Sequence, residues 1–276
     1  MSAAGPAGGD LAALFIAACH AELRAPKPGN VHDYAPGHRM TVADFETSAA
    51  VAAPHIAAHG APIGERVLGA VRATMEAVGC NTNLGILLLT APIALAAERP
   101  GELRANLTAI LTETTIYDAE CVFEAIRIAN PGGLGRAEEA DVAEPPSVTL
   151  TQAMALAADR DTIARQYVTR FDDVYAIGLP TFLRESARSD EIRATLLVYF
   201  AYASRLPDSH ILRKHGVTVA EAVRGEFAEL RGIADVMDLP ALLDFDRELK
   251  MRGVNPGTSA DLTVATHFLA HVTVYK

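Results

Sequence analysis

The chain has 276 residues, half of them apolar, and a formal net charge of -10. This charge argues against a nucleic acid or an anionic membrane as partner, because such partners normally select a basic surface. A phosphorylated small molecule remains open as a ligand if basic side chains gather locally or a divalent cation mediates.

The cysteines and the first residues bear on the compartment. Cys19, Cys80 and Cys121 lie far apart without a C-x-x-C pair, which indicates neither a disulfide framework nor a thiolate zinc site and favours a reducing cytoplasm. The first ten residues lack the basic start of a signal peptide. We therefore expect residues 1–10 to form a disordered N-terminal tail and residues 11–276 to form one domain.

Apolar residues recur at intervals of three and four along most of the chain, which predicts amphipathic helices. Asp10 is the expected N-cap of a helix to about Leu23. Further helices are expected at 42–59, 65–78, 149–178, 191–206 and 220–238. Strand-like alternation is nearly absent, so the predicted fold class is all-α, a single multi-helix bundle.

The most apolar segment, residues 84–97, contains Pro92 and is shorter than the roughly 20 residues that a bilayer-spanning helix needs. It is expected to be a buried core helix. The longest irregular stretch, residues 130–147, is long enough to cover a site, although such a loop is more often a surface excursion.

Four loops are richer in polar side chains than a connecting turn requires: residues 22–38, 79–85, 207–216 and 252–262. Binding groups commonly sit on loops that a rigid scaffold holds. In a helical bundle these loops could converge at one end, and we expect the active site to be formed by loops and helix ends there.

These loops allow a structural interpretation, such as helix capping, as well as a ligand-binding one. Arg213, Lys214 and His215 precede a glycine, so they either favour a helix C-terminus or clamp a polyphosphate. Thr82 or Asn83 either simply caps the following helix or leaves its N-terminus as an anion site. Thr258 with Asp261 resembles a weak capping box, and Asp261 is alternatively a magnesium ligand.

The remaining histidines and acids carry weaker signals. His55, His59, His267 and His271 sit in apolar helical patterns, where core or surface positions are commoner than ligands, and no H-E-x-x-H spacing occurs. Arg160, Asp161, Arg165, Asp172 and Asp173 form a charged helical cluster that is expected to be a solvated or paired face. Whether Asp161 and Asp173 reach a bound cation stays open.

Taken together, the loops resemble the triphosphoribosyl-dephospho-CoA synthase family. The matching elements are E-x-x-x-x-K-P-G-x-V from Glu22 to Val31, G-x-N-T with a later glycine from Gly79 to Gly85, D-S-H-I-x-R-K-H-G from Asp208 to Gly216, and N-P-G-x-S-A-D-L from Asn255 to Leu262. Each element is weak alone, but four in order over nearly the whole chain are a fairly specific signal.

The resemblance implies an all-α enzyme that moves the 5-triphosphoribosyl group of ATP to an acceptor hydroxyl, with adenine leaving and Mg²⁺ assisting. It implies Glu22 and Asp208 as catalytic residues, with Glu22 as general base, and Asp208 and Asp261 as metal ligands. The implied ATP and phosphate-binding set is Lys27, Gly29, Asn30, His32, Asn81, Thr82, Asn83, Arg213, Lys214, His215, Asn255 and Ser259. On this reading the PKPG loop presents Lys27 and backbone N–H groups to an anion.

The chain departs from the family pattern in two elements. It reads KPGNVHDY, then GHRM without the family's later aspartate, and NTNLG where the family has N-T-H-K-G. These forms resemble a branch of the family found in archaea and methylotrophic bacteria, which leaves the acceptor as either dephospho-CoA or a ribitol-bearing tetrahydromethanopterin precursor. The family's α-ribosyl linkage, made by inversion at C1′ of ATP, is compatible with the second acceptor.

Two other classes of function compete with this reading. A helical magnesium-dependent hydrolase of nucleotides or ADP-ribosyl groups would also use aspartates and asparagines at loop ends. A non-enzymatic interaction protein has less need of charged clusters at several loop ends. The alanine-rich helices could support a homodimer, but no sequence feature fixes the stoichiometry.

Overall fold

A computed structural model describes residues 8–132 and 139–275. Its elements are α1 (Gly8–Arg24), α2 (Val42–Ile56), α3 (Ile63–Val78), α4 (Leu84–Glu98), α5 (Leu103–Thr112), α6 (Ile116–Ala129), α7 (Leu150–Ala155), α8 (Thr162–Thr169), η1 (Val174–Gly178), α9 (Leu179–Ser186), α10 (Glu191–Ala203), α11 (Ser209–His215), α12 (Val217–Glu229), α13 (Arg231–Asp235), α14 (Leu239–Met251) and α15 (Gly257–Tyr275). The described residues form helices and no sheet, which confirms the all-α prediction.

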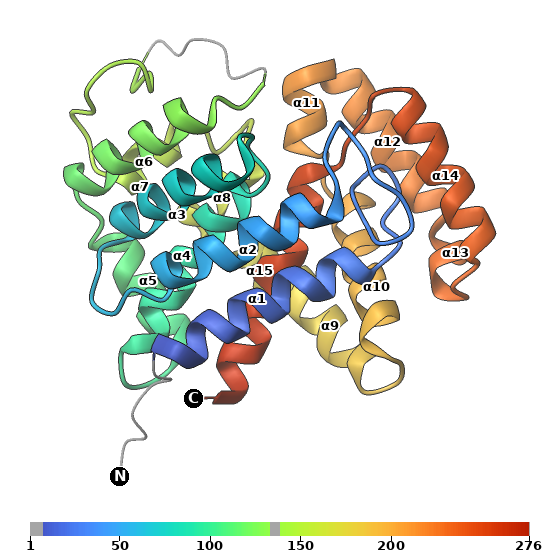
Figure 1. Cartoon of the computed structure of the whole chain (residues 1–276), viewed down its shortest axis with the longest axis horizontal. Helices are drawn as coiled ribbons and strands as arrows, with labels where there is room; N and C mark the ends of the chain where they lie inside the picture. The colour runs from blue at the N-terminus through green and yellow to red at the C-terminus, as the bar shows by residue number, and fades with distance from the viewer. Residues whose placement is uncertain (1–7, 133–138, 276) are drawn as a thin grey trace.

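The helices are arranged around two hydrophobic cores. In Figure 1, α3 to α8 lie on one side, α11 to α14 lie on the other, and α1, α2, α10 and α15 lie between them. The larger core includes side chains of α1 to α6 and α15, and the smaller core includes side chains of α11, α12 and α14. Helix α10 contributes to both cores, with Val198 in the larger and Phe200 in the smaller. One helix that is apolar all round therefore joins the two halves.

The core-helix prediction for residues 84–97 is confirmed. Helix α4 has Leu87, Leu89 and Ile93 with no exposed surface, and neighbouring helices cover it. Within the described ranges, no single helix has the length and apolar character to cross a membrane. Helices α4 and α5 meet that test only as a pair, and they are bent by 115° at their junction.

Helix limits were predicted less well. Helix α1 begins at Gly8, before the expected cap at Asp10, so the last part of the tail expected at residues 1–10 is helical, and residues 1–7 lie outside the described residues. The predicted continuous helix at 149–178 was wrong, because the chain forms α7, α8 and η1 there. Arg170 and Phe171 have φ angles of 58° and 61°, in the left-handed region that no right-handed helix contains. The predicted helix at 220–238 is likewise divided into α12 and α13.

Candidate active site

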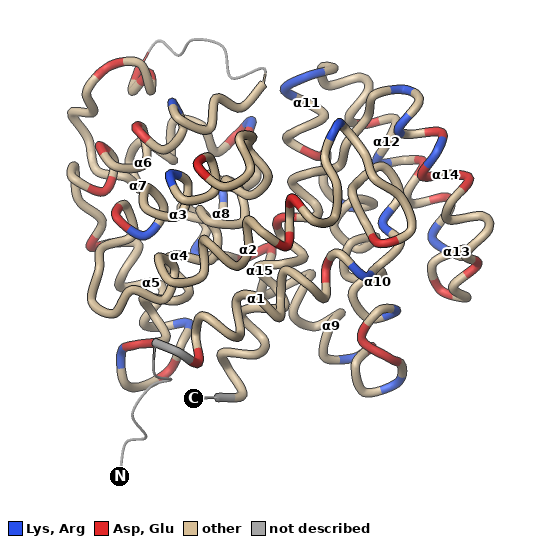
Figure 2. The backbone as a smooth tube through the Cα atoms, viewed as in Figure 1, with Lys and Arg blue, Asp and Glu red and all other residues tan. Residues whose placement is uncertain are grey.

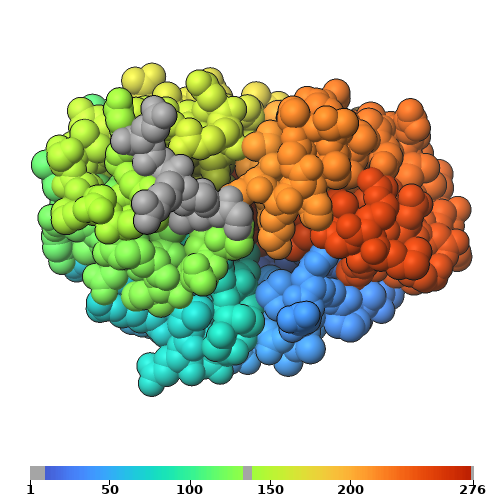
Figure 3. Space-filling view, turned by 90° about the horizontal axis from the view of Figure 1, so that it is seen from above, coloured from blue at the N-terminus to red at the C-terminus, as the bar shows by residue number. Residues whose placement is uncertain are grey.

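A cavity of about 910 Å³ lies where the four polar loops meet. Each loop contributes to its lining, through Asn30, Asn81, Arg213 and Asp261 among others, and α6 to α8 complete the wall. Figure 3 shows the surface hollowed between the segment before α8 and the orange α11. The prediction that these loops converge at one end of the bundle is therefore confirmed.

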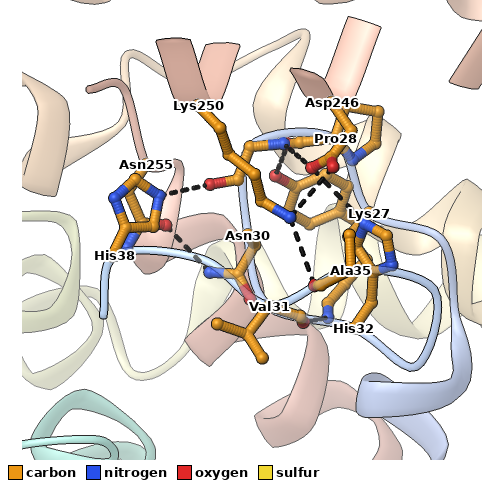
Figure 4. A network of polar contacts seen from close by, with 12 residues as sticks. Lys27, Pro28, Asn30, Val31, His32, Ala35, His38, Asp246, Lys250 and Asn255 are labelled. Atoms are coloured by element: carbon orange, nitrogen blue, oxygen red, sulfur yellow. Dashed lines mark hydrogen bonds and ion pairs between the residues drawn. The ribbon is translucent and has the colours of Figure 1, made fainter. Parts of the chain in front are cut away.

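The KPG loop is locked to the segment before α15 (Figure 4). Gly29 has φ of 83°, and a Cβ atom there would stand 2.8 Å from Cδ of Pro256, so only glycine fits. Its backbone N–H donates to Oδ1 of Asp246 on α14, at 2.8 Å. One residue on, the Asn30 amide donates to Oδ1 of Asn255, at 2.9 Å. Asn30 and Asn255 line the cavity, and Gly29 holds their loops together.

Lys27 lies behind the cavity wall. Its ammonium is fully buried, 2.8 Å from the Glu22 carboxylate, and it donates to the carbonyl oxygen of Val31 at 2.7 Å. Burial raises the pKa of Glu22 and lowers that of Lys27, while their mutual contact opposes both shifts. Glu22 lines the cavity and Lys27 does not, so Lys27 supports the carboxylate from behind, and its contact with phosphate stays a prediction.

Asp208 joins the third loop to the fourth. One of its carboxylate oxygens accepts from the backbone N–H of Ser259 at 2.8 Å and from the Ser259 hydroxyl at 2.9 Å. The other accepts from the N–H groups of His210 and Ile211, which makes Asp208 the N-cap of α11. Both oxygens are thus occupied in a buried position, and neither Asp208 nor Ser259 is among the lining residues. This placement differs from the predicted catalytic and metal-binding roles of Asp208.

The N-terminus of α4 forms another part of the lining. The Asn81 side chain accepts from the N–H of Leu84, so Asn81 performs the capping that we expected of Thr82 or Asn83. Thr82 donates to Ser48 at 2.6 Å, and Asn83 donates to Thr74 at 3.0 Å. All three predicted residues line the cavity, with Asn81 closing the end of the helix and the other two holding its loop.

Asp261, in the first turns of α15, lies against that helix end. A Cβ atom on Gly85 would stand 2.1 Å from Oδ2 of Asp261, so the glycine of the NTNLG element leaves room for this carboxylate. Asp261 lines the cavity, and no hydrogen bond or ion pair connects it to the residues in the described ranges. Burial raises its pKa well above the ordinary value, and Asp208, Glu22 and Asp161 raise it further. Such a carboxylate favours a bound cation.

Basic residues lie at the end of α11, which is blue in Figure 2, and they form another part of the cavity lining. Arg213 and Lys214 line the cavity as predicted. Arg213 lies 3.5 Å from Asp161 and donates to the carbonyl oxygen of Gly132 at 3.1 Å. Burial, with Lys214 and Arg213 nearby, lowers the pKa of His210 to about 3, so its ring is neutral. This combination of two cations with a neutral ring suits a polyphosphate.

The structure leaves two predicted histidines outside the lining. His215 is exposed and contacts the carbonyl oxygen of Gly253 at 3.2 Å. His32 is fully buried, with Nε2 located 3.4 Å from Oδ1 of Asp246. Of the two acids left open, Asp161 lines the cavity, whereas Asp173 accepts hydrogen bonds from Arg165 and Gln166 away from it.

Several lining residues were missed. His38 and Arg39 have φ angles of 55° and 65°, a costly conformation for such side chains that the surrounding structure must enforce. His38 contacts the carbonyl oxygen of Gly29 at 2.8 Å. His210 belongs to the motif from Asp208 to Gly216. Its ring packs on Gly257, and this contact between two loops cannot be read from the motif. Arg160 belonged to a cluster that we expected to be a solvated or paired face.

The family model described as ATP:dephospho-CoA triphosphoribosyl transferase (CitG) matches residues 9–276. The chain belongs to this family. It is therefore a transferase that acts on ATP and moves its triphosphoribosyl group to a small-molecule acceptor. This result confirms the resemblance drawn from the four loops and excludes the non-enzymatic reading.

A solved structure of a CitG-like protein agrees. The chain is similar to a candidate triphosphoribosyl-dephospho-CoA synthase from Archaeoglobus fulgidus, with 27% identity and a TM-score of 0.67 over 83% of this chain and 99% of that one. No curated protein sequence matches. The similarity covers nearly the whole archaeal chain, so the two share the fold that brings the loops together.

Proposed function

We propose that the loop-lined cavity holds Mg²⁺-ATP, and that Asp261 supplies an oxygen ligand to the metal. The observation that carries this proposal is the Asp261 carboxylate, which lines the cavity without a hydrogen bond or ion pair among the described residues and lies near other acids. Mg²⁺ prefers carboxylate oxygens and normally keeps waters and substrate phosphates as its remaining ligands. Asp208 is assigned to holding the loops, since Ser259, His210 and Ile211 already use both of its oxygens.

The triphosphate would lie between this metal and the basic side chains. Arg213 offers a planar fork to phosphate oxygens, and Lys214 offers a compact charge. Both lie in the lining with Arg39 and Arg160. Because the triphosphate stays intact in this reaction, these groups bind the donor and position its ribose without taking part in bond breaking.

The chemistry takes place at C1′ of the ribose. The acceptor oxygen forms a bond to C1′, the bond from C1′ to N9 of adenine breaks, and its electron pair leaves with adenine, which takes up a proton. The developing positive charge on the ribose favours a nearby carboxylate. Glu22 lines the cavity with its pKa raised by burial, which suits a base that receives the proton of the attacking hydroxyl.

For the acceptor we propose a ribitol-bearing arylamine precursor of tetrahydromethanopterin, with dephospho-CoA as the second candidate. The wall of the cavity formed by α3, α6 and α7 is apolar, with Met75, Phe123, Ile126 and Met154 in the lining. Such a wall suits a neutral aromatic ring. In the altered element, Asn83 contacts Thr74 and Leu84 begins α4, where the family pattern has a histidine and a lysine. Dephospho-CoA is the acceptor after which the family is named.

The test compares the two acceptors at equal concentration with ATP, Mg²⁺ and purified protein. The proposal expects kcat/KM for adenine release to be at least tenfold higher with the ribitol arylamine. A higher value with dephospho-CoA would reject the proposed acceptor while preserving the transfer reaction. Adenine release with water alone, without an acceptor, would instead support the hydrolase alternative.

A further inference from the structure

A second cluster of metal-ligating side chains lies away from the cavity. Glu191 begins α10, and His267 and His271 lie in the C-terminal half of α15. One possible ligand atom from each residue lies within 4.8 Å of the others. Helix α15 begins beside α11 and ends at the opposite side of the molecule (Figure 1), and the cluster follows Asp261 by two to three turns.

The hydrogen bonds around His267 fix which ring nitrogen is free. The hydroxyl of Thr195 donates its one proton to the carbonyl oxygen of Glu191, at 2.7 Å. Its oxygen also lies 2.9 Å from Nε2 of His267, so this nitrogen must carry the proton and donate it to Thr195. Nδ1 of His267 therefore has an unprotonated lone pair, and it is buried without a hydrogen-bond partner.

An unpartnered lone pair on a fully buried histidine requires an explanation, since buried polar atoms are nearly always satisfied. The arrangement is the one that metal-bound histidines show, in which one ring nitrogen binds the metal and the other donates to a fixed acceptor. The four-residue spacing places His267 and His271 on one face of α15, with ring centroids 5.9 Å apart. Phe182 packs edge-on against both rings and restricts their orientation.

The third possible ligand comes from the start of α10. The third group, Glu191, is exposed and lies 3.6 Å from Arg24 in a surface ion pair. Such pairs are weak, so the carboxylate is free to approach a cation.

We propose that Glu191, His267 and His271 form a zinc-class divalent metal site that clamps the start of α10 to α15. Two imidazoles with one carboxylate suit Zn²⁺ and disfavour Mg²⁺, which prefers oxygen. Ligand atoms around tetrahedral zinc stand about 3.3 Å apart, which follows from bonds of about 2.0–2.1 Å. A change of rotamer at the exposed Glu191 side chain would bring its carboxylate to this spacing, and water would complete the coordination. This site does not depend on the proposed acceptor or on Mg²⁺ in the cavity.

The experiment titrates the chelator-treated full chain with Zn²⁺ against a chromophoric chelator, in excess Mg²⁺ to occupy oxygen sites. We expect one tight Zn²⁺ per chain. The affinity should fall about 100-fold or more in His271→Ala and at least tenfold in Glu191→Gln. His59→Ala is the matched control, because His59 is an exposed histidine that lies near Glu98 and away from the proposed site. The affinity of this variant for Zn²⁺ should equal that of the wild type.

Two further readouts separate a metal site from a packing role. Zn²⁺ should raise the Tm of the wild type and of His59→Ala, but not that of His271→Ala, and the metal-free variants should still unfold cooperatively. Zn²⁺ should also shift the NMR resonance of Nδ1 of His267 while Nε2 stays protonated. An absence of tight Zn²⁺ binding, or an affinity unchanged in both ligand variants, would overturn the proposal.

Discussion

Gly85 and Asp261 are in such close contact that a Cβ atom on the glycine would stand 2.1 Å from Oδ2 of the carboxylate. Gly85 lies in the first turn of α4 and Asp261 in the first turns of α15, so the two residues are separated by 176 positions (261 - 85). Their contact places the N-terminus of α4 against the acid that we propose as a magnesium ligand. The position of Asp261 therefore depends on the absence of a side chain at residue 85.

The first prediction follows from this contact. Gly85→Ala should displace the Asp261 carboxylate, lower kcat at least tenfold and cost about 1–3 kcal/mol of unfolding free energy, as overpacking does. Gly225→Ala is the control, because it is also a helical glycine but nothing lies within 4 Å of its added Cβ. The control should keep full activity and gain up to about 1 kcal/mol of stability. Equal activity in both variants would show that Asp261 tolerates displacement.

The second prediction concerns pH and Mg²⁺. The pKa of Asp261 is raised in the folded chain, so the folded state holds this proton more tightly than the unfolded state does. Asp261 should therefore lower stability increasingly as pH rises above 3.8, until the folded pKa is passed. Asp261→Asn removes this cost, so its advantage over the wild type in unfolding free energy should grow with pH in the absence of metal.

Added Mg²⁺ should reverse that difference at neutral pH by binding the wild type and not Asp261→Asn. Urea unfolding with and without Mg²⁺ measures both effects. A wild type that gains no stability from Mg²⁺, alone or with ATP, would contradict the metal assignment.

A third prediction distinguishes structural from catalytic acids. Asp208→Asn should lose about 1–3 kcal/mol of unfolding free energy, because the buried bonds to Ser259 and to the start of α11 weaken. Its activity should fall mainly through KM for ATP, since the loops that bind ATP separate. If Asp208→Asn is as stable as the wild type but its kcat falls 100-fold or more, Asp208 takes part in the reaction itself.

How much of this site is visible in the sequence depends on the kind of contact. The motif residues identify the loops, and the apolar spacing identifies most helices, because both patterns are local. Asp246 and Lys250 carry no such signal, although Asp246 accepts the N–H of Gly29 and Lys250 pairs with Asp246 at 2.9 Å. Their position on α14 opposite the KPG loop follows only from the fold.

Local patterns also failed where tertiary contacts decide. The motifs contain Asp208, Ser259, Glu22 and Lys27, but they do not reveal that Asp208 accepts hydrogen bonds from Ser259 or that Lys27 and Glu22 form a buried ion pair. The break at Phe171 is similar, since burial of its ring accompanies a left-handed backbone that helical periodicity does not reveal.

A fourth prediction concerns Arg213 and Lys214, the basic side chains of α11 that line the cavity. Arg213→Gln and Lys214→Met should each raise KM for ATP about tenfold or more, which corresponds to about 1.4 kcal/mol of binding, with little effect on kcat. His215→Ala is the control from the same triplet, since His215 is exposed and outside the lining. Its KM should stay within about twofold of the wild type. If His215→Ala raises KM as much as the other two, the triplet contacts phosphate as originally expected.

A fifth prediction concerns the buried ion pair that Lys27 and Glu22 form at the cavity lining. Lys27→Met should leave the Glu22 carboxylate without its partner and cost about 3–5 kcal/mol of unfolding free energy. Adding Glu22→Gln should recover much of that loss, while activity stays low because the proposed base is missing. Thermal and urea unfolding of Lys27→Met, Glu22→Gln and the double variant measure the coupling. Additive losses would show that the two side chains act independently.

The most direct test of the central claim is the stoichiometry of the reaction. Purified protein with Mg²⁺, ATP and the preferred acceptor should release one adenine for each acceptor molecule that gains an intact triphosphoribosyl group, measured by chromatography and mass spectrometry, without matching ADP or phosphate. The same assay with Asp261→Asn should lose both products together. Release of ADP or phosphate in place of adenine, or adenine without a triphosphoribosylated acceptor, would contradict the account.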